Sequence, residues 1–116
     1  MLGRAGEDLV ARKYQEMGWA LLDRNWRVRA GELDLVFGRD HVRVFCEVKT
    51  RRSTAFGTPA EAVTSLKQAR IRRLAVLWLS TQTGNTAPIT ELRFDVASVV
   101  VGEGGVATLD IIEAAF

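Results

Sequence analysis

Apolar and polar residues recur along the chain with two periods, and each period predicts one kind of element. Between residues 4 and 17, Val10, Tyr14 and Met17 follow helical spacing, and Gly18 comes next as a terminator. Alternation with a period of two predicts strands over residues 20–28, 32–37, 42–48, 90–101 and 106–112. The order helix, three strands, helix, two strands therefore predicts an α/β or α+β sheet with helices laid against it.

The second helix is predicted from about Ser65 to Thr81, with Thr64 as its N-cap. Its buried stripe is predicted to consist of Ile71, Leu74, Ala75 and Trp78. Upstream, the segment TPAE at residues 58–61 is a capping box with proline at the first helical position, which predicts a further helical turn.

Length and composition limit the kind of protein this is. With 116 residues, 47% of them hydrophobic, one domain spanning residues 1–116 is expected. No stretch is long and apolar enough to span a bilayer, and the N-terminus has no apolar run of signal-peptide length, so a cytoplasmic location is expected. The single cysteine, Cys46, excludes an intrachain disulfide and a cysteine zinc site.

Positive charge is concentrated in the middle of the chain. Residues 49–73 contain seven Lys or Arg and one acid, whereas residues 74–116 contain one Arg and five acids. Such density is typical of a surface that faces phosphates, and the alternative is a solvated helix face. The candidate nucleic-acid contacts are Arg51, Arg52, Lys67, Gln68, Arg70 and Arg73, with Arg72 beside them. For Lys67, a snorkelling structural role stays open.

The segment FCEVKTRR at residues 45–52 places Glu47 and Lys49 at the end of a strand that reads as buried. Removing both charges from water costs about as much as their attraction returns, so a role other than stability is indicated. Because strand side chains alternate, Glu32 and Asp34 share one face of the preceding strand, and Glu47 and Lys49 share one face of this strand.

The turn between these strands decides whether the two faces coincide. A two-residue loop at residues 39–40, or a four-residue loop at 38–41, sets Asp34 opposite Phe45 and makes Asp34 and Glu47 diagonal neighbours. A three- or five-residue loop places the two sets on opposite sides. In the first register the two acids can share a divalent cation, and Lys49 lies beside it. The alternative is a cross-strand salt-bridge network on a solvated face.

Three further features carry expectations of their own. Glu7 lies on the apolar stripe of the first helix and in its first turn, so it is either a member of the metal site or an acid stabilised by the helix dipole. Asp95 is predicted to pair with a nearby arginine. Trp78 and the apolar tail IIEAAF are candidates for a homodimer surface.

The acidic and basic residues also form a recognisable set. Glu7, the GELD segment with Asp34, and EVK with Glu47 and Lys49 resemble the PD-(D/E)XK nuclease superfamily, which includes archaeal Holliday-junction resolvases. More closely, the segments NWR, GELDLV, VFCEVKTRR, FGTPAEAVT, KQARIRRLA and RFDV resemble the YraN family of small bacterial proteins. The likeness covers nearly the whole chain. One departure is Leu33, which precedes Asp34 where the superfamily name has proline.

This resemblance implies a restriction-endonuclease-like α/β fold, with a mixed central sheet flanked by helices in the order α-β-β-β-α-β-β. It implies that Asp34, Glu47 and Lys49 form a hydrolytic centre dependent on Mg²⁺ or Mn²⁺, with Glu7 as the helix-borne acid. The Val48 carbonyl is implied as a further metal ligand. The expected function is an endonuclease acting on nucleic acid, with DNA as the expected substrate; the alternative is a nucleic-acid-binding module that does not cut.

Overall fold

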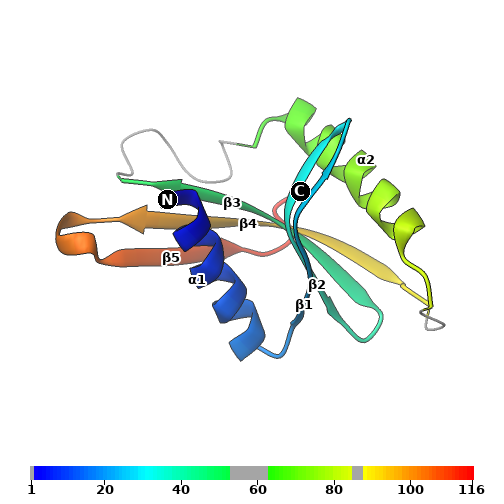
Figure 1. Ribbon diagram of the computed structural model, residues 1–116, viewed down its shortest axis with the longest axis horizontal. Helices are drawn as coiled ribbons and strands as arrows, with labels where there is room; N and C mark the ends of the chain where they lie inside the picture. The colour runs from blue at the N-terminus through cyan, green and yellow to red at the C-terminus, as the bar shows by residue number, and fades with distance from the viewer. Residues whose placement is uncertain (1, 53–62, 85–87) are drawn as a thin grey trace.

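The computed structural model describes residues 2–52, 63–84 and 88–116 (Figure 1). Its elements are α1 (Leu2–Glu16), β1 (Ala20–Val28), β2 (Gly31–Arg39), β3 (Val42–Arg51), α2 (Ser65–Thr81), β4 (Glu91–Val101), the 3₁₀ turn η2 (Glu103–Gly105) and β5 (Ala107–Ile112). The predicted order is confirmed. The predicted TPAE turn lies outside the described residues.

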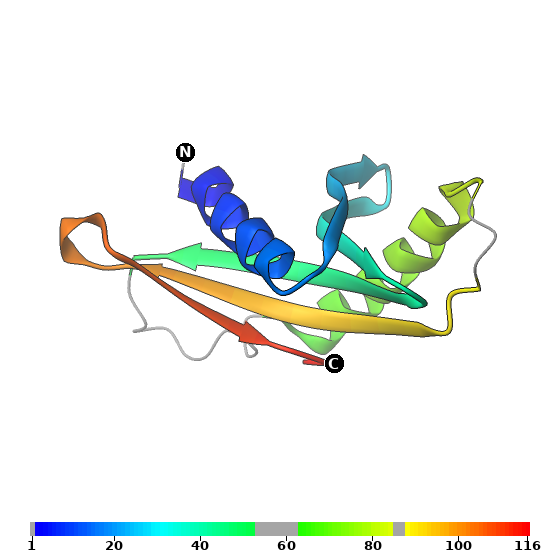
Figure 2. The same cartoon turned by 90° about the horizontal axis from the view of Figure 1, so that it is seen from below.

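The five strands form one mixed sheet in the order β1-β2-β3-β4-β5. Neighbouring strands are antiparallel except β3 and β4. These two run parallel because the connection through α2 returns the chain to the end of the sheet at which β3 begins. The two helices lie on opposite faces of the sheet, as Figure 2 shows for α1. A mixed sheet flanked by helices in this order is the predicted restriction-endonuclease-like arrangement.

Each helix buries one apolar stripe against its own face of the sheet. On β3, Val44 and Cys46 pack toward α1, whereas Phe45 between them packs toward α2. The buried residues of α2 are the predicted Ile71, Leu74, Ala75 and Trp78. Within the described residues, neither helix is long and apolar enough to cross a membrane.

The register of the β2–β3 hairpin differs from the prediction. Asp40 and His41 form its two-residue turn, so Phe45 lies opposite Val36 and not opposite Asp34. Asp40 adopts φ 52°, a left-handed conformation that aspartate tolerates in turns. Because the shift is two residues, each side chain keeps its predicted face. If the observed pairing continued by one more residue, Asp34 would lie opposite Glu47.

The β1–β2 hairpin separates from β3 beyond the pair of Leu35 with Cys46. Pairing of β2 with β3 ends at Leu35 and Cys46, whereas pairing of β2 with β1 continues to Gly31 and Val28. Figure 2 shows the hairpin bending away from the other strands. At its tip, Gly31 approaches α2 so closely that a side-chain carbon would lie 3.1 Å from Leu74. The separation leaves a fork between β2 and β3.

Asp95 of β4 is fully buried and joins three parts of the fold. Its carboxylate accepts hydrogen bonds from the Tyr14 hydroxyl of α1, from two nitrogens of Arg93 at 3.0 and 2.9 Å, and from the Ala114 backbone N–H. The predicted pairing with an arginine is confirmed. Burial, with the Cys46 and Asp95 side chains adding to it, raises the pKa of Tyr14, so this hydroxyl remains a donor.

Of the residues suggested for a dimer surface, Trp78 is buried, whereas the tail is half-buried or exposed. Trp78 is 1% exposed, and its indole donates to Asp23 at 2.9 Å. Phe116 of the tail stacks on Phe94 with 5.3 Å between ring centroids. The prediction of a dimer surface is therefore wrong for Trp78, because its side chain is already buried in the core.

Candidate active site

Asp34 lies at the fork, where β2 has left β3. Its Oδ2 accepts a hydrogen bond from the Val48 backbone N–H at 2.9 Å, so the side chain replaces the missing strand partner. A backbone N–H of a strand points along the plane of the sheet toward its neighbour. The Asp34 carboxylate therefore lies between the two faces of the sheet, within reach of groups from both.

Two other acids act on Asp34 from different elements. Burial, then the Glu47 carboxylate of β3, and more weakly Glu7 of α1, raise the pKa of Asp34 to about 7, against the opposing effect of the Val48 N–H. When Asp34 is protonated, its carboxyl group can donate to Glu47, and this adds to the rise in pKa. Three predicted acids thus influence one position, and their mutual repulsion favours a cation there.

Glu47 is buried on the α2 side of the fork and contacts two lysines. Its Oε1 lies 2.8 Å from Lys67 Nζ and 3.6 Å from Lys49 Nζ. Burial, followed by the neighbouring Lys67 ammonium, lowers the pKa of Lys49, although Glu47 opposes this. Burial also acts to lower the pKa of Lys67, but its contact with Glu47, and donation to Lys49 when that amine is neutral, raise it above the usual value. Lys49 is therefore the lysine that loses its proton more easily.

Glu7 approaches the fork from the α1 side. Its Oε1 lies 3.5 Å from Arg24 Nη2, and its Oε2 accepts from Asn25 Nδ2 at 3.2 Å. The same Asn25 amide donates to Glu32 at 3.2 Å, and Glu32 also pairs with Arg27 at 3.3 Å. Asn25 was not among the predicted site residues; the available signal was its place in the NWR segment. At φ 51° it is one of the non-glycine residues in the left-handed region.

The acids have not converged into a ready metal site. Among the described residues, no group of three or more His, Cys, Asp and Glu side chains is arranged to hold a metal ion. The contacts above give the physical reason, because Glu47 is turned toward Lys67 and Glu7 toward Arg24. The structure therefore brings Glu7, Asp34 and Glu47 into one neighbourhood, with basic partners on both sides.

The predicted nucleic-acid contacts are in different environments. Arg52, Arg70 and Arg73 are exposed, and Arg51 is half-buried on β3 beyond Lys49. The Gln68 amide donates to the Val63 carbonyl at 3.1 Å, next to the start of α2. Arg72 is exposed and lies over the rings of Phe94 and Phe116, 5.5 Å from each centroid, so part of its side chain packs on the tail.

Gly6 sets the distance between α1 and β3 and thereby the position of Glu7. A methyl group on Gly6 would overlap Thr50 Oγ1 and lie 3.2 Å from Thr50 Cβ. We expect Gly6→Ala to lower the free energy of unfolding by about 1–2 kcal/mol, since overpacking outweighs the better helix propensity of alanine. Urea denaturation measures this change.

The matched control is the double variant Gly6→Ala/Thr50→Ala, which removes the atom that the new methyl group would overlap. Adding Gly6→Ala to the Thr50→Ala protein should therefore lower the free energy of unfolding much less than adding it to the wild type. A Gly6→Ala protein as stable as the wild type would show that α1 does not need this close approach.

Comparison with known proteins places the chain in a family. The model of the uncharacterised protein family UPF0102 matches residues 6–99, a range that contains all the acids and lysines described above. A UPF0102 protein of Nocardia farcinica is 50% identical over 115 residues, covering 99% of this chain and 88% of the relative. One of Rhodococcus opacus is 47% identical over 115 residues, covering 99% and 95%. One of Frankia alni is 54% identical over 98 residues, covering 84% and 79%. The chain therefore belongs to the uncharacterised protein family UPF0102, which is the YraN family that its motifs resemble.

Proposed function

We propose that this protein is a metal-dependent nuclease that hydrolyses phosphodiester bonds, with DNA as its substrate. The observation that carries the proposal is the position of Asp34, a half-buried carboxylate with a pKa raised to about 7 by burial, Glu47 and Glu7. A carboxylate kept in this position weakens the fold at neutral pH. Strongly shifted acids of this kind cluster at functional sites, where a bound cation relieves their repulsion.

The donor set fits Mg²⁺ or Mn²⁺. These ions prefer oxygen ligands, and Asp34, Glu47 and the Val48 carbonyl would supply them, with Glu7 acting directly or through water. When bound, such an ion polarises a phosphoryl oxygen and makes water a stronger acid. The observation in the chain that fits such an ion is the raised pKa of Asp34, because the repulsion from Glu47 and Glu7 persists although two lysines contact Glu47.

The remaining roles belong to groups beside the acids. Lys49, with its lowered pKa, would orient the attacking water or accept its proton, and its charged form would stabilise negative charge on the phosphate. Lys67 holds Glu47 in place from the first turn of α2. The exposed Arg52, Arg70 and Arg73 would contact the sugar-phosphate backbone, which positions a strand without reading its sequence.

The second candidate is a nucleic-acid-binding module that does not cut. The observation in its favour is that two lysines already neutralise Glu47, and that the described residues hold no preformed three-acid site. Under this alternative, Lys49 and Lys67 serve as ion-pair partners of Glu47, and the basic surface alone carries the function.

Cleavage assays separate the two candidates. The purified chain is incubated with supercoiled, single-stranded and branched DNA in the presence of Mn²⁺ or Mg²⁺, beside Glu47→Gln and Lys49→Ala. We expect the wild type to cut at least one substrate and each variant to be at least about 100-fold slower, because each removes a group at the reacting centre. The matched control is Glu16→Gln, which changes an exposed acid of α1 and should cut like the wild type.

Each other outcome has a defined meaning. Cleavage that persists in both site variants would show that the reacting centre lies elsewhere. Absence of cleavage, combined with DNA binding that weakens steeply with salt, would replace the nuclease by the binding module.

A further inference from the structure

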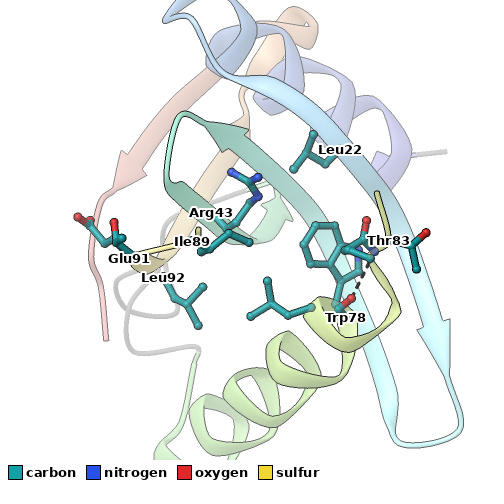
Figure 3. Close-up of a pocket in the computed structure, with 10 residues that line it drawn as sticks. Leu22, Arg43, Trp78, Thr83, Ile89, Glu91 and Leu92 are labelled. Carbon is teal, nitrogen blue, oxygen red and sulfur yellow. Dashed lines mark hydrogen bonds between the residues drawn. The ribbon is translucent and has the colours of Figure 1, made fainter. Parts of the chain in front are cut away.

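A pocket of about 600 Å³ lies apart from the acids, beside the C-terminal end of α2 (Figure 3). It opens between α2, β1 and the beginnings of β3 and β4. Its apolar lining consists of Leu22, Trp78, Leu79, Ile89 and Leu92. Arg43 also lines it, about 13 Å along β3 from Glu47 at 3.3 Å per residue. The pocket is therefore a separate site and not an extension of the fork.

The Arg43 side chain carries a buried charge in this pocket. The residue is 8% exposed, and Figure 3 shows its guanidinium among the pocket residues. No carboxylate in the described part of the chain forms an ion pair with it, although Glu91 also lines the pocket. Burying a charge without an opposite charge is costly, so the site favours an anion.

One edge of this guanidinium is already used and the other is available. Nη1 donates to the backbone carbonyls of Asp40 at 3.2 Å and Val42 at 2.9 Å. Nε and Nη2 make no hydrogen bond to the described residues, and neither is among the fully buried polar atoms without a partner. These two groups point their N–H bonds side by side, which is the edge that binds a carboxylate with two parallel hydrogen bonds.

Gly38 makes room for this arrangement. It lies opposite Arg43 in the β2–β3 ladder, inside a strand where glycine is otherwise unfavourable. A side-chain carbon on Gly38 would lie 3.0 Å from Arg43 Nη1, 3.3 Å from its Cζ and 2.7 Å from Leu22 Cδ1. The missing side chain therefore lets the guanidinium and the Leu22 wall lie together over the strand.

We infer that this pocket binds a small organic carboxylate with an apolar body. The carboxylate would accept from Nε and Nη2 of Arg43, and the body would pack between Leu22, Leu92 and the Trp78 indole. A singly charged group suits these apolar walls better than a phosphate dianion, and Glu91 at the pocket repels multiply charged anions. This inference does not depend on the proposed nuclease activity.

Titration of the ¹⁵N-labelled full-length chain followed by NMR tests the inference. The probes are 3-phenylpropanoate, its neutral analogue 3-phenylpropanamide, and phenyl phosphate. We expect the carboxylate to shift the Trp78 indole and the backbone amides of Thr83, Thr90 and Leu92 saturably. The amide should bind at least about 10-fold more weakly because it loses the charge-matched bidentate pair. The phosphate should be weaker by a similar factor because its second charge has to be desolvated against the apolar walls, next to Glu91.

Two variants assign the effect to the pocket. Arg43→Gln should weaken 3-phenylpropanoate binding at least about 10-fold, whereas Arg12→Gln removes an exposed charge on α1 and should leave binding unchanged. If Arg43→Gln does not fold, Leu92→Trp provides the test, since residue 92 is 37% exposed and a larger ring fills the pocket without removing Arg43. It should reduce affinity by a similar factor.

Four results would overturn the inference. The first is the absence of saturable 3-phenylpropanoate binding up to about 10 mM, and the second is equal affinity for phenyl phosphate. The third is a set of chemical-shift changes centred on Glu47, and the fourth is unchanged affinity in Leu92→Trp.

Discussion

Replacing Asp95 by asparagine is expected to lower the free energy of unfolding by about 3–5 kcal/mol, the cost of breaking a buried ion pair by removing one partner. Asp95 is fully buried and accepts hydrogen bonds from Tyr14, Arg93 and Ala114. Asparagine keeps the shape but has one acceptor oxygen and no charge, so Arg93 is left without its buried partner. Urea denaturation followed by circular dichroism measures the loss.

The chain contains a matched control for this prediction. Glu113 also pairs with Arg93, at 3.4 Å, but its side chain is 58% exposed. Exposed pairs contribute little, so Glu113→Gln should cost less than about 1 kcal/mol. If the two substitutions cost the same, the buried network around Asp95 does not hold α1 and the C-terminal segment to β4.

Replacing Asp34 by asparagine is expected to have the opposite effect on stability. We expect Asp34→Asn to raise the free energy of unfolding at pH 8 by about 1–3 kcal/mol. The ceiling is about 4 kcal/mol, from a shift of roughly three pKa units at 1.36 kcal/mol each, and partial exposure reduces it. Asparagine still accepts from the Val48 N–H, so the local geometry is kept. DNA cleavage should be lost in the same variant.

The pH dependence follows from the sign of the shift. Burial and Glu47 raise the folded-state pKa of Asp34 from 3.8 to about 7. Between these values the folded chain keeps the proton that the unfolded chain has released, so this group's contribution is fully present below pH 3.8 and is lost as pH rises to about 7. Denaturation of wild type and Asp34→Asn from pH 4 to pH 8 reports this group together with the lysines coupled to it, because titrations of distant groups cancel in the difference.

Two measurements check that the effect belongs to the proposed site. Glu16→Gln, an exposed substitution on α1, should show no such pH-dependent gain. Mn²⁺ at pH 8 should stabilise the wild type and not Asp34→Asn, because only the wild type retains the carboxylate. An Asp34→Asn protein less stable than the wild type at pH 8 would mean that the ionised Asp34 supports the fold.

Local patterns were sufficient for the elements and for the face on which each strand residue lies. The α2 boundaries and its buried stripe follow from helical spacing after Thr64, and these depend only on neighbours in the chain. Alternation predicted the shared face of Asp34 and Glu47 only for a two- or four-residue loop; the observed loop has two residues, so the faces are kept although the register differs by two residues. The segment NWR was noticed, but no local rule gives Asn25 its contacts with Glu7 and Glu32.

The tertiary structure decided the register and the partners of the acids. The hairpin turn lies at Asp40 and His41, where the His41 carbonyl accepts from Thr90 and Glu91, far away in the sequence. The ion pair of Lys67 with Glu47 likewise joins α2 to the face of β3 that this helix covers. The sequence by itself therefore determined which residues carry the charge and on which side of each element they lie. Only the fold decided which charges meet, because those contacts depend on how strands separate and helices pack.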